Sequence, residues 1–181
     1  MKNSLPTSKV KKSVAGKVLS ASLRKAGSAK VKTKAAAKAP SLVQSCIYAS
    51  SGQAAVSAPP PSLLIASLKT GLKMEELEVL RSSLDLPMDR LAPMLGISKA
   101  TLHRRKAAGR LDPSESDRVV RFARLTGKAI DILESLQSAR SWLTSPQFGL
   151  GGAIPLEYAE TEVGAREVED LLGRIEYGVF S

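Results

Sequence analysis

Acidic residues are what the first part of this sequence lacks. Residues 1–73 contain no Asp or Glu and 13 Lys or Arg, whereas residues 74–181 carry 14 basic and 17 acidic side chains. The formal net charge of +10 of the 181-residue chain therefore comes from its N-terminal segment. Basicity is a property of one end of the chain, not of the whole protein.

Cysteine and histidine are equally scarce, which excludes several kinds of site. Cys46 alone can form neither an intrachain disulfide framework nor a multi-thiolate zinc site, and its isolation fits a reducing compartment. His103, the single histidine, has no Cys or His neighbour and is a poor metal ligand. The carboxylates are scattered, so no nucleophile–base pair or metal set emerges. We expect no enzyme activity, metal or cofactor.

Long apolar runs are absent too. No stretch approaches the roughly 18 to 20 apolar residues that a helix needs to span a bilayer, and the N-terminus lacks the continuous apolar core of a secretory signal. We therefore expect a cytoplasmic protein without membrane contact.

Residues 1–61 are predicted to be a disordered basic tail rich in Lys, Ala and Ser. High charge and few large apolar residues leave too little burial to offset the loss of chain entropy. Such a polycation can lie along nucleic-acid phosphates and add salt-dependent affinity that is blind to sequence. A solubilising extension, or a consequence of start-site choice at Met1 instead of Met74, is an equally weighted alternative. A transit peptide ranks last because Arg24 is the only arginine before residue 74.

Residues 62–126 are predicted to form a helix-turn-helix DNA-binding and dimerisation region. Leu77, Leu80 and Leu84 follow a helical period behind an acidic first turn. Further along, the stretch LAPMLGISKATL has an alanine in the middle of one helix and Gly96 four residues later, at a position that suits a tight turn. An apolar residue and a serine N-cap for the next helix follow. This order is the helix-turn-helix spacing, in which the second helix enters a major groove about 12 Å wide.

The second helix of this motif carries the predicted DNA contacts. If Leu102 faces the core, its neighbours one or two steps away face outward and can reach bases. Two departures from the pattern stand out: Pro93 lies inside the first helix, and position 105, often apolar in such motifs, is Arg. The alternative is an exposed basic helix without a ligand. The predicted base-reading set is Lys99, Ala100, His103 and Arg104, and the remaining predicted DNA-binding residues are Ser98, Thr101, Arg105, Lys106 and Arg110.

A further helical segment follows the motif. Asp112 is placed to cap it before Pro113, a residue favoured at the first helical position, and Gly127 is expected to break it. Its arginines at three-residue spacing fit either the flank of a DNA backbone or a plain solvated face. Operator-binding regions of this size commonly act as dimers on two half-sites, so we expect a homodimer.

The C-terminal part, which we predict to span residues 127–181, has a net negative charge, in contrast to the basic N-terminal segment. Residues 129–181 carry 3 basic and 9 acidic side chains, a composition not suited to phosphate. We expect Pro155 to open a short helix and Thr161 to cap a final one that ends near Gly178. The glycine-rich stretch GLGGAIP lacks the Gly-Lys-Ser/Thr ending of a phosphate loop, and no strand precedes it.

Three pieces of the chain together resemble a known family, the Xre-type antitoxins of RES/Xre toxin–antitoxin pairs, which include the MbcA and ParS antitoxins. The pieces are LAPMLGISKATLHRRKAAGRL, DPSESDRVVRFARL, and the ending that runs from ARSWL to PLEYAETEVGAREVEDLLGRIEYGVF. The resemblance covers roughly residues 70–181 and leaves the basic tail out. It implies an all-α antitoxin, dimeric through its middle helices, whose C-terminal domain lies across the active-site entrance of a toxin that attacks NAD or transfers ADP-ribose.

The same resemblance implies a set of toxin-binding residues. For Trp142, Leu156 and the glycines, the alternative is that they close a small C-terminal core; we favour the core for Trp142 and the partner for the residues after the last helix. An acidic segment that ends in aromatic residues fits a cationic, dinucleotide-binding pocket. The implied set is Trp142, Leu143, Pro146, Gly151, Gly152, Pro155, Leu156, Thr161, Gly164, Tyr177, Gly178, Val179, Phe180 and Ser181.

Two functions therefore remain open at this stage. The first is an antitoxin that blocks a RES-type or ADP-ribosylating toxin and binds operator DNA to repress its own operon. The second is a stand-alone helix-turn-helix regulator or nucleoid-type DNA-binding protein without a toxin partner.

Overall fold

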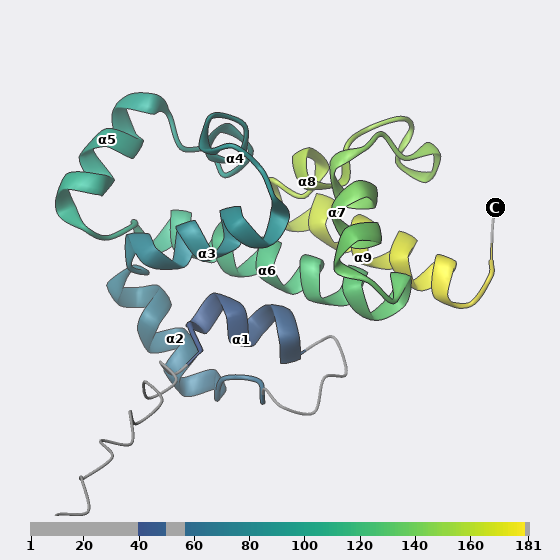
Figure 1. Ribbon diagram of the computed structural model, residues 1–181, viewed down its shortest axis with the longest axis horizontal. Coiled ribbons are helices and arrows are strands. Elements are labelled where there is room, and N and C mark those ends of the chain that lie inside the picture. The colour runs from purple at the N-terminus through teal and green to yellow at the C-terminus, as the bar shows by residue number, and fades with distance from the viewer. Residues whose placement is uncertain (1–39, 50–56, 180–181) are drawn as a thin grey trace, which may run out of the picture. The chain divides into compact units, whose positions relative to one another are not determined.

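The computed structural model describes residues 40–49 and 57–179, which all belong to one unit spanning residues 38–181 (Figure 1). These residues form helices and isolated bridges without a β-strand, which confirms the predicted all-α class. The helices are α1 (Leu42–Ala49), α2 (Pro61–Thr70), α3 (Met74–Leu84), α4 (Met88–Met94), α5 (Lys99–Ala108), α6 (Pro113–Leu133), α7 (Leu136–Thr144), the 3₁₀ turn η1 (Phe148–Leu150), α8 (Pro155–Tyr158) and α9 (Glu162–Glu176).

The long helix α6 organises the unit. It packs against α1, α2, α3, α7 and α9, and its Phe122, Leu125 and Ala129 are fully buried. The predicted start of this helix is confirmed: Asp112 is its N-cap, Pro113 its first residue, and Asp112 and Glu115 form a capping box. One element therefore links the helix-turn-helix to the C-terminal helices.

The predicted break at Gly127 is wrong. Helix α6 continues through this position to Leu133 and ends at Glu134 in a left-handed conformation. A glycine inside a helix costs about 1 kcal/mol relative to alanine, which is too little to end a helix buried on several sides. Gly127 itself is buried. The boundary that we predicted between residues 126 and 127 thus falls inside a continuous helix.

Helix α1 corrects the prediction that residues 1–61 are disordered throughout. Its Val43 and Ile47 are completely buried, Cys46 nearly so, and the helix lies against α6 and α3. Apolar side chains four residues apart line one helix face, and their burial outweighs the entropy of ordering eight residues. Residues 1–39 and 50–56 of the predicted tail lie outside the described residues.

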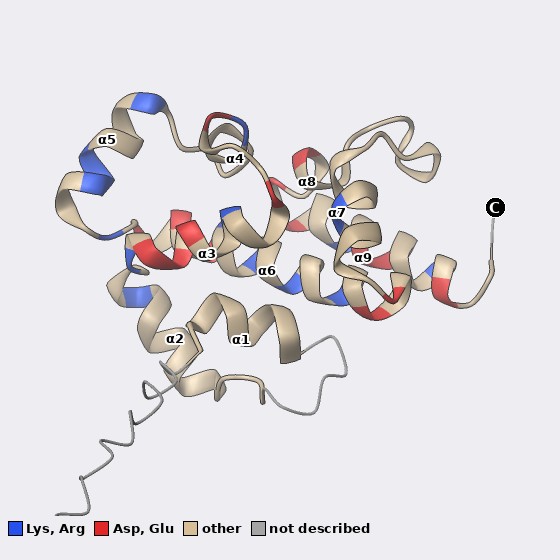
Figure 2. Cartoon of the chain, in the orientation of Figure 1, with Lys and Arg blue, Asp and Glu red and all other residues tan. Residues whose placement is uncertain are grey.

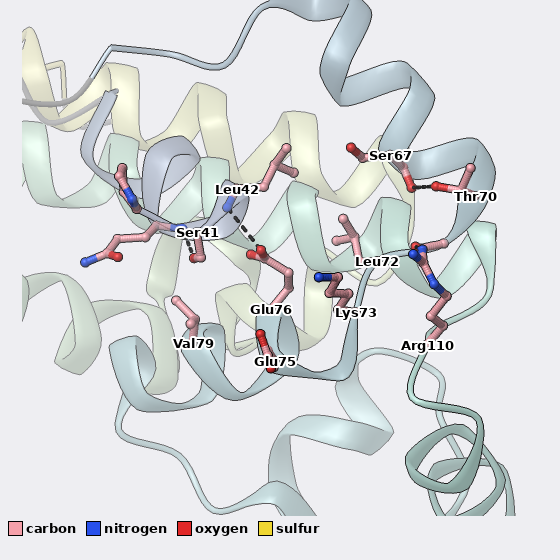
Figure 3. A pocket seen from close by; sticks show the side chains of 13 residues that line it. Ser41, Leu42, Ser67, Thr70, Leu72, Lys73, Glu75, Glu76, Val79 and Arg110 are labelled. Carbon is pink, nitrogen blue, oxygen red and sulfur yellow. Dashed lines mark hydrogen bonds between the residues drawn. The ribbon is translucent and has the colours of Figure 1, made fainter. Parts of the chain in front are cut away.

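An acidic side chain of α3 holds the start of α1. The Glu76 carboxylate accepts a hydrogen bond from the backbone N–H of Leu42 at 3.1 Å (Figure 3). It also accepts one from the backbone N–H of Val43 at 2.8 Å. It satisfies donors that have no partner within the first turn of a helix. On the same helix, burial raises the pKa of the Cys46 thiol, so thiolate formation at neutral pH is suppressed. Helix α1 is therefore an integrated part of the fold.

The three last helices form a small core that is continuous with that of the helix-turn-helix. Leu143 of α7, Leu156 of α8, and Val168 and Leu172 of α9 are all fully buried. Within the described residues, none of the helices combines the length and apolar character needed to cross a membrane.

Candidate DNA-binding and partner-binding sites

The turn between α4 and α5 has the geometry that its sequence predicts. Gly96 has a φ of +67°, Ile97 is buried, and the Ser98 side chain caps α5 by accepting from the Thr101 N–H at 3.1 Å. Helix α4 has only seven residues, so Pro93 near its end interrupts little of the helical hydrogen bonding. The proline is compatible with the motif because the first helix is short.

Helix α5 stands out from the unit with little of its surface buried. Leu102 is its one buried residue. Among the predicted DNA contacts, Ser98, Lys99, Ala100, His103, Arg104, Lys106 and Arg110 are exposed and Thr101 is half-buried. Figure 2 shows basic residues along α5 and acidic ones on α3, α8 and α9. The exposed face of α5 is thus free of carboxylates and available to a polyanion.

Arg105 behaves differently from its neighbours. Its Nε lies 2.9 Å from Oε2 and 3.1 Å from Oε1 of Glu115, and its Nη2 lies 3.3 Å from Oδ1 of Asp112. The Glu115 side chain is only 8% exposed and also accepts from the Asp112 N–H at 2.8 Å. Arg105 therefore occupies the usual apolar position of the motif by pairing with a buried carboxylate, and we remove it from the proposed phosphate contacts.

Two more arginines tie the motif to the rest of the unit. Arg118 of α6 donates to the carbonyl of Leu95 at 2.9 Å and lies against Gly96, where a Cβ would come within 2.5 Å of Nη1. At the other end of α5, Arg110 donates to the carbonyl of Gly71 at 2.8 Å. Guanidinium groups thus form hydrogen bonds on both sides of α5, at Leu95 before it and at Arg110 after it.

The arginines of α6 do not present a uniform face. Arg118 serves the turn, and Arg121 pairs with Asp117 at 2.7 Å and with Glu162 of α9 at 3.2 Å. Arg124 is exposed. Two of the three arginines therefore make hydrogen bonds or ion pairs to other parts of the same chain. Neither of the two predicted alternatives, a flank along a DNA backbone or a solvated face, describes this role.

The residues predicted to bind a toxin fall into two groups. Leu143, Pro155, Leu156 and Gly164 are buried, and Trp142 is partly buried against the core. Gly164 has no room for a side chain, because a Cβ there would overlap the carbonyl oxygen of Tyr158. These residues build the C-terminal core, the alternative that the sequence had left open for some of them.

The other group is exposed. Gly151 and Gly152 have positive φ values and open space around them, so they shape the loop backbone. The Thr161 side chain caps α9 by accepting from the Gly164 N–H at 3.1 Å. Tyr177 is 79% exposed, and Pro146, Gly178 and Val179 are exposed as well. Phe180 and Ser181 lie outside the described residues.

Sequence reasoning missed Phe148, which is 96% exposed at the start of η1. The loop that carries it is closed at its base, where the Gln147 N–H donates to Ala153 and the Gly152 N–H donates to Gln147, at 3.0 and 2.9 Å. The available signal was a large aromatic residue followed directly by glycine in the uncharged stretch 145–156. The exposed Tyr158 and Val163 were missed as well.

No cluster of three or more His, Cys, Asp or Glu side chains that could hold a metal ion occurs among the residues that the structure describes. Two exposed surfaces stand out there: the basic face of α5 and the exposed apolar side chains of the C-terminal part.

Comparisons with known proteins match both the helix-turn-helix region and the C-terminal part. Residues 63–124 match the antitoxin Xre-like helix-turn-helix domain, and residues 128–178 match the antitoxin Xre/MbcA/ParS C-terminal toxin-binding domain. An "Antitoxin Xre" from Yersinia enterocolitica is 36% identical over 122 residues, which are 66% of this chain and 82% of the relative. A "Prs ADP-ribosylating antitoxin" from Sphingobium is 26% identical over 127 residues, 65% of this chain and 80% of the relative. An "Antitoxin Xre" from Photorhabdus laumondii is 38% identical over 74 residues, 40% and 50% of the two chains.

Proposed function

Because the chain belongs to the Xre antitoxin family, we propose that it neutralises a partner toxin with its C-terminal part and binds operator DNA with its helix-turn-helix. The observation that carries the proposal is that the two matched domains meet on one helix, since α6 spans residues 113–133. The protein would act in the cytoplasm as a homodimer, repressing the operon that encodes it and its toxin.

On the toxin side, we propose that the partner consumes NAD or transfers ADP-ribose and that this protein covers its active-site entrance. The support is indirect: a net acidic C-terminal part fits a cationic pocket that receives a dinucleotide. The contacts proposed are the exposed members of the predicted set: Pro146, Gly151, Gly152, Thr161, Tyr177, Gly178 and Val179, with Phe180 and Ser181 retained from the sequence.

On the DNA side, we propose that α5 reads bases in the major groove. Its first turns carry Lys99, Ala100, His103 and Arg104, and a lysine or arginine can donate to guanine while an alanine contacts the thymine methyl group. Ser98, Thr101, Lys106 and Arg110 are placed for phosphates. Hydrogen bonds at Leu95 and Arg110, on either side of α5, help to hold the segment that carries this helix in the fold.

Co-expression with the protein encoded by the adjacent reading frame tests the proposal. That protein alone is expected to arrest growth, and the full chain is expected to co-purify with it and restore growth. If the neighbour is harmless when expressed alone, a stand-alone regulator becomes the better description.

Arg104→Ala is expected to reduce discrimination between operator and random DNA by about 10-fold or more, because a bidentate contact to a base contributes about 1 to 3 kcal/mol. Measuring both affinities at one salt concentration checks this, since phosphate contacts are salt-dependent. Lys106→Ala is the matched control: it should weaken both affinities alike. An equal loss on both DNAs for Arg104→Ala would identify it as a phosphate contact instead.

A further inference from the structure

Phe148 is the most exposed large apolar side chain in the part of the chain that the structure describes. At 96% it is exposed far beyond Leu63 and Ile65, at 52% and 53%. An isolated exposed leucine or isoleucine is normal for a soluble protein. Almost the whole surface of this phenylalanine ring lies in water, so moving the ring into an apolar pocket would give a large favourable free energy.

The loop that carries the ring is held in place. Besides the two hydrogen bonds at its base, the Gln147 side-chain amide donates to the carbonyls of Trp142 at 2.9 Å and Ser145 at 3.1 Å. Gly149 lies directly on α9, where a Cβ would come within 2.6 Å of Cδ1 of Leu171. The ring is therefore presented by a preorganised loop, and little conformational entropy remains to be lost when it binds.

The surroundings of the ring are neutral in an otherwise acidic part of the chain. Residues 145–156 contain no charged side chain, whereas residues 129–181 as a whole carry 9 acidic and 3 basic ones. The loop contacts the second half of α9, the helix that leads to the exposed Tyr177 and Val179. Figure 1 shows the loop between α7 and α8 on the same side of the view as the C-terminal end.

From these observations we infer that Phe148 is the anchor residue of the toxin contact, inserting its ring into an apolar pocket on the toxin. The inference rests on the proposed function, and one observation favours a toxin as the partner: the loop lies inside residues 128–178, which match a toxin-binding domain. A central aromatic residue that fills a pocket, ringed by weaker contacts, is the usual source of binding energy at protein interfaces.

A second copy of this chain fits the ring less well. A protruding side chain needs a pocket elsewhere on its partner, which makes a head-to-tail contact, and such contacts generate open chains unless the rotation closes. A dimer through a two-fold axis instead needs a self-complementary surface on both copies. A single ring on a convex loop does not supply one.

The experiment compares the full chain with Phe148→Ala for affinity to the protein encoded by the adjacent reading frame. Loss of an anchor aromatic is expected to weaken binding by at least about 30-fold, with the unfolding midpoint unchanged because the ring touches little of its own protein. Ile65→Ala, an exposed apolar residue outside the toxin-binding match, is the matched control and should stay within about 3-fold of wild type.

Each outcome decides a different point. If the wild-type chain binds and the affinity of Phe148→Ala lies within about 3-fold of the wild-type value, the inference is overturned and the proposed function stands. The same holds if Ile65→Ala loses as much affinity as Phe148→Ala. If Phe148→Ala lowers self-association and leaves toxin affinity unchanged, the ring serves a second copy and the inference is wrong. If the wild-type chain does not bind the neighbouring protein at all, the proposed function and the inference both fall.

Discussion

Gly164→Ala is expected to lower the free energy of unfolding by about 3 kcal/mol, and the same substitution at Gly173 is expected to raise it by up to about 1 kcal/mol. Both glycines lie in α9. At Gly164 the new Cβ would overlap the carbonyl oxygen of Tyr158, a backbone atom that can move only if α8 moves with it. At Gly173 nothing lies within 4 Å, so only the helix preference for alanine acts.

Thermal and urea unfolding of the two variants measure these opposite shifts. A loss of about 3 kcal/mol corresponds to a midpoint lowered by roughly 10 °C for a domain of this size. Because the C-terminal core would loosen, toxin neutralisation should fall with stability for Gly164→Ala and stay unchanged for Gly173→Ala. Equal unfolding midpoints for the two variants would show that the close contact between Gly164 of α9 and the Tyr158 carbonyl of α8 does not exist.

The result for Gly164→Ala also bears on the toxin-binding set implied by the family resemblance, whose residues can either contact the toxin or serve the protein's own core. A sequence motif records that a glycine is needed but not whether a partner or the protein's own backbone needs it. Gly164 faces its own α8, whereas Gly151 and Gly152 have open space around them and supply positive φ to a loop. The distinction depends on which atoms meet in three dimensions, and sequence spacing does not contain it.

Local chemistry, by contrast, could be predicted from the sequence. The sequence predicts Ser98, Asp112 and Thr161 as helix caps, and all three are N-caps in the structure. The turn at Gly96 and the burial of Leu102 were also predicted correctly. Caps and turns depend on residues within a few positions of each other, so a single sequence shows them.

The errors concern tertiary context. Helix α1 was missed because the lysine-rich composition of residues 1–38 was extended to residue 61, although no charged residue occurs between Lys38 and Lys69. Its stability comes from packing on α6 and from the Glu76 carboxylate, 33 and 34 residues away. Helix propensity predicts a break at Gly127, because propensity contains no information about a helix that is buried on several sides.

Arg105 shows the same limit. Its position among basic residues of the sequence predicts a contact to DNA, whereas in the structure it forms an ion pair with Glu115. Glu115 holds both the guanidinium of Arg105 and the first backbone N–H of the α6 capping box. One carboxylate thus joins the end of the recognition helix to the start of the central helix. Leu102 is the only buried residue of α5, and this ion pair is a second point at which the helix is attached to the rest of the unit.

Glu115→Ala is therefore expected to lower the free energy of unfolding by about 3 kcal/mol, because the partly buried guanidinium of Arg105 loses its nearer carboxylate partner and keeps only Asp112, while α6 loses part of its cap. Operator affinity should fall more than toxin affinity, since α5 loses its anchor while the C-terminal core is untouched. Unfolding curves and both binding constants check this. Glu78→Ala is the control: its pair with Arg81 is 47% and 37% exposed, and its loss should cost less than about 0.5 kcal/mol.

The double variant Arg105→Met with Glu115→Ala distinguishes an ion pair from two independent contributions. Part of the cost of the single change comes from a guanidinium left with only the more exposed, more distant Asp112, so removing that charge as well is expected to restore about 1 to 2 kcal/mol of the loss. Methionine also fits the apolar character usual at this position of the motif. If the double variant is as unstable as the sum of the two single variants, Arg105 and Glu115 stabilise the protein independently. Helix α5 would then be positioned by Leu102 and by the flanking hydrogen bonds at Leu95 and Arg110.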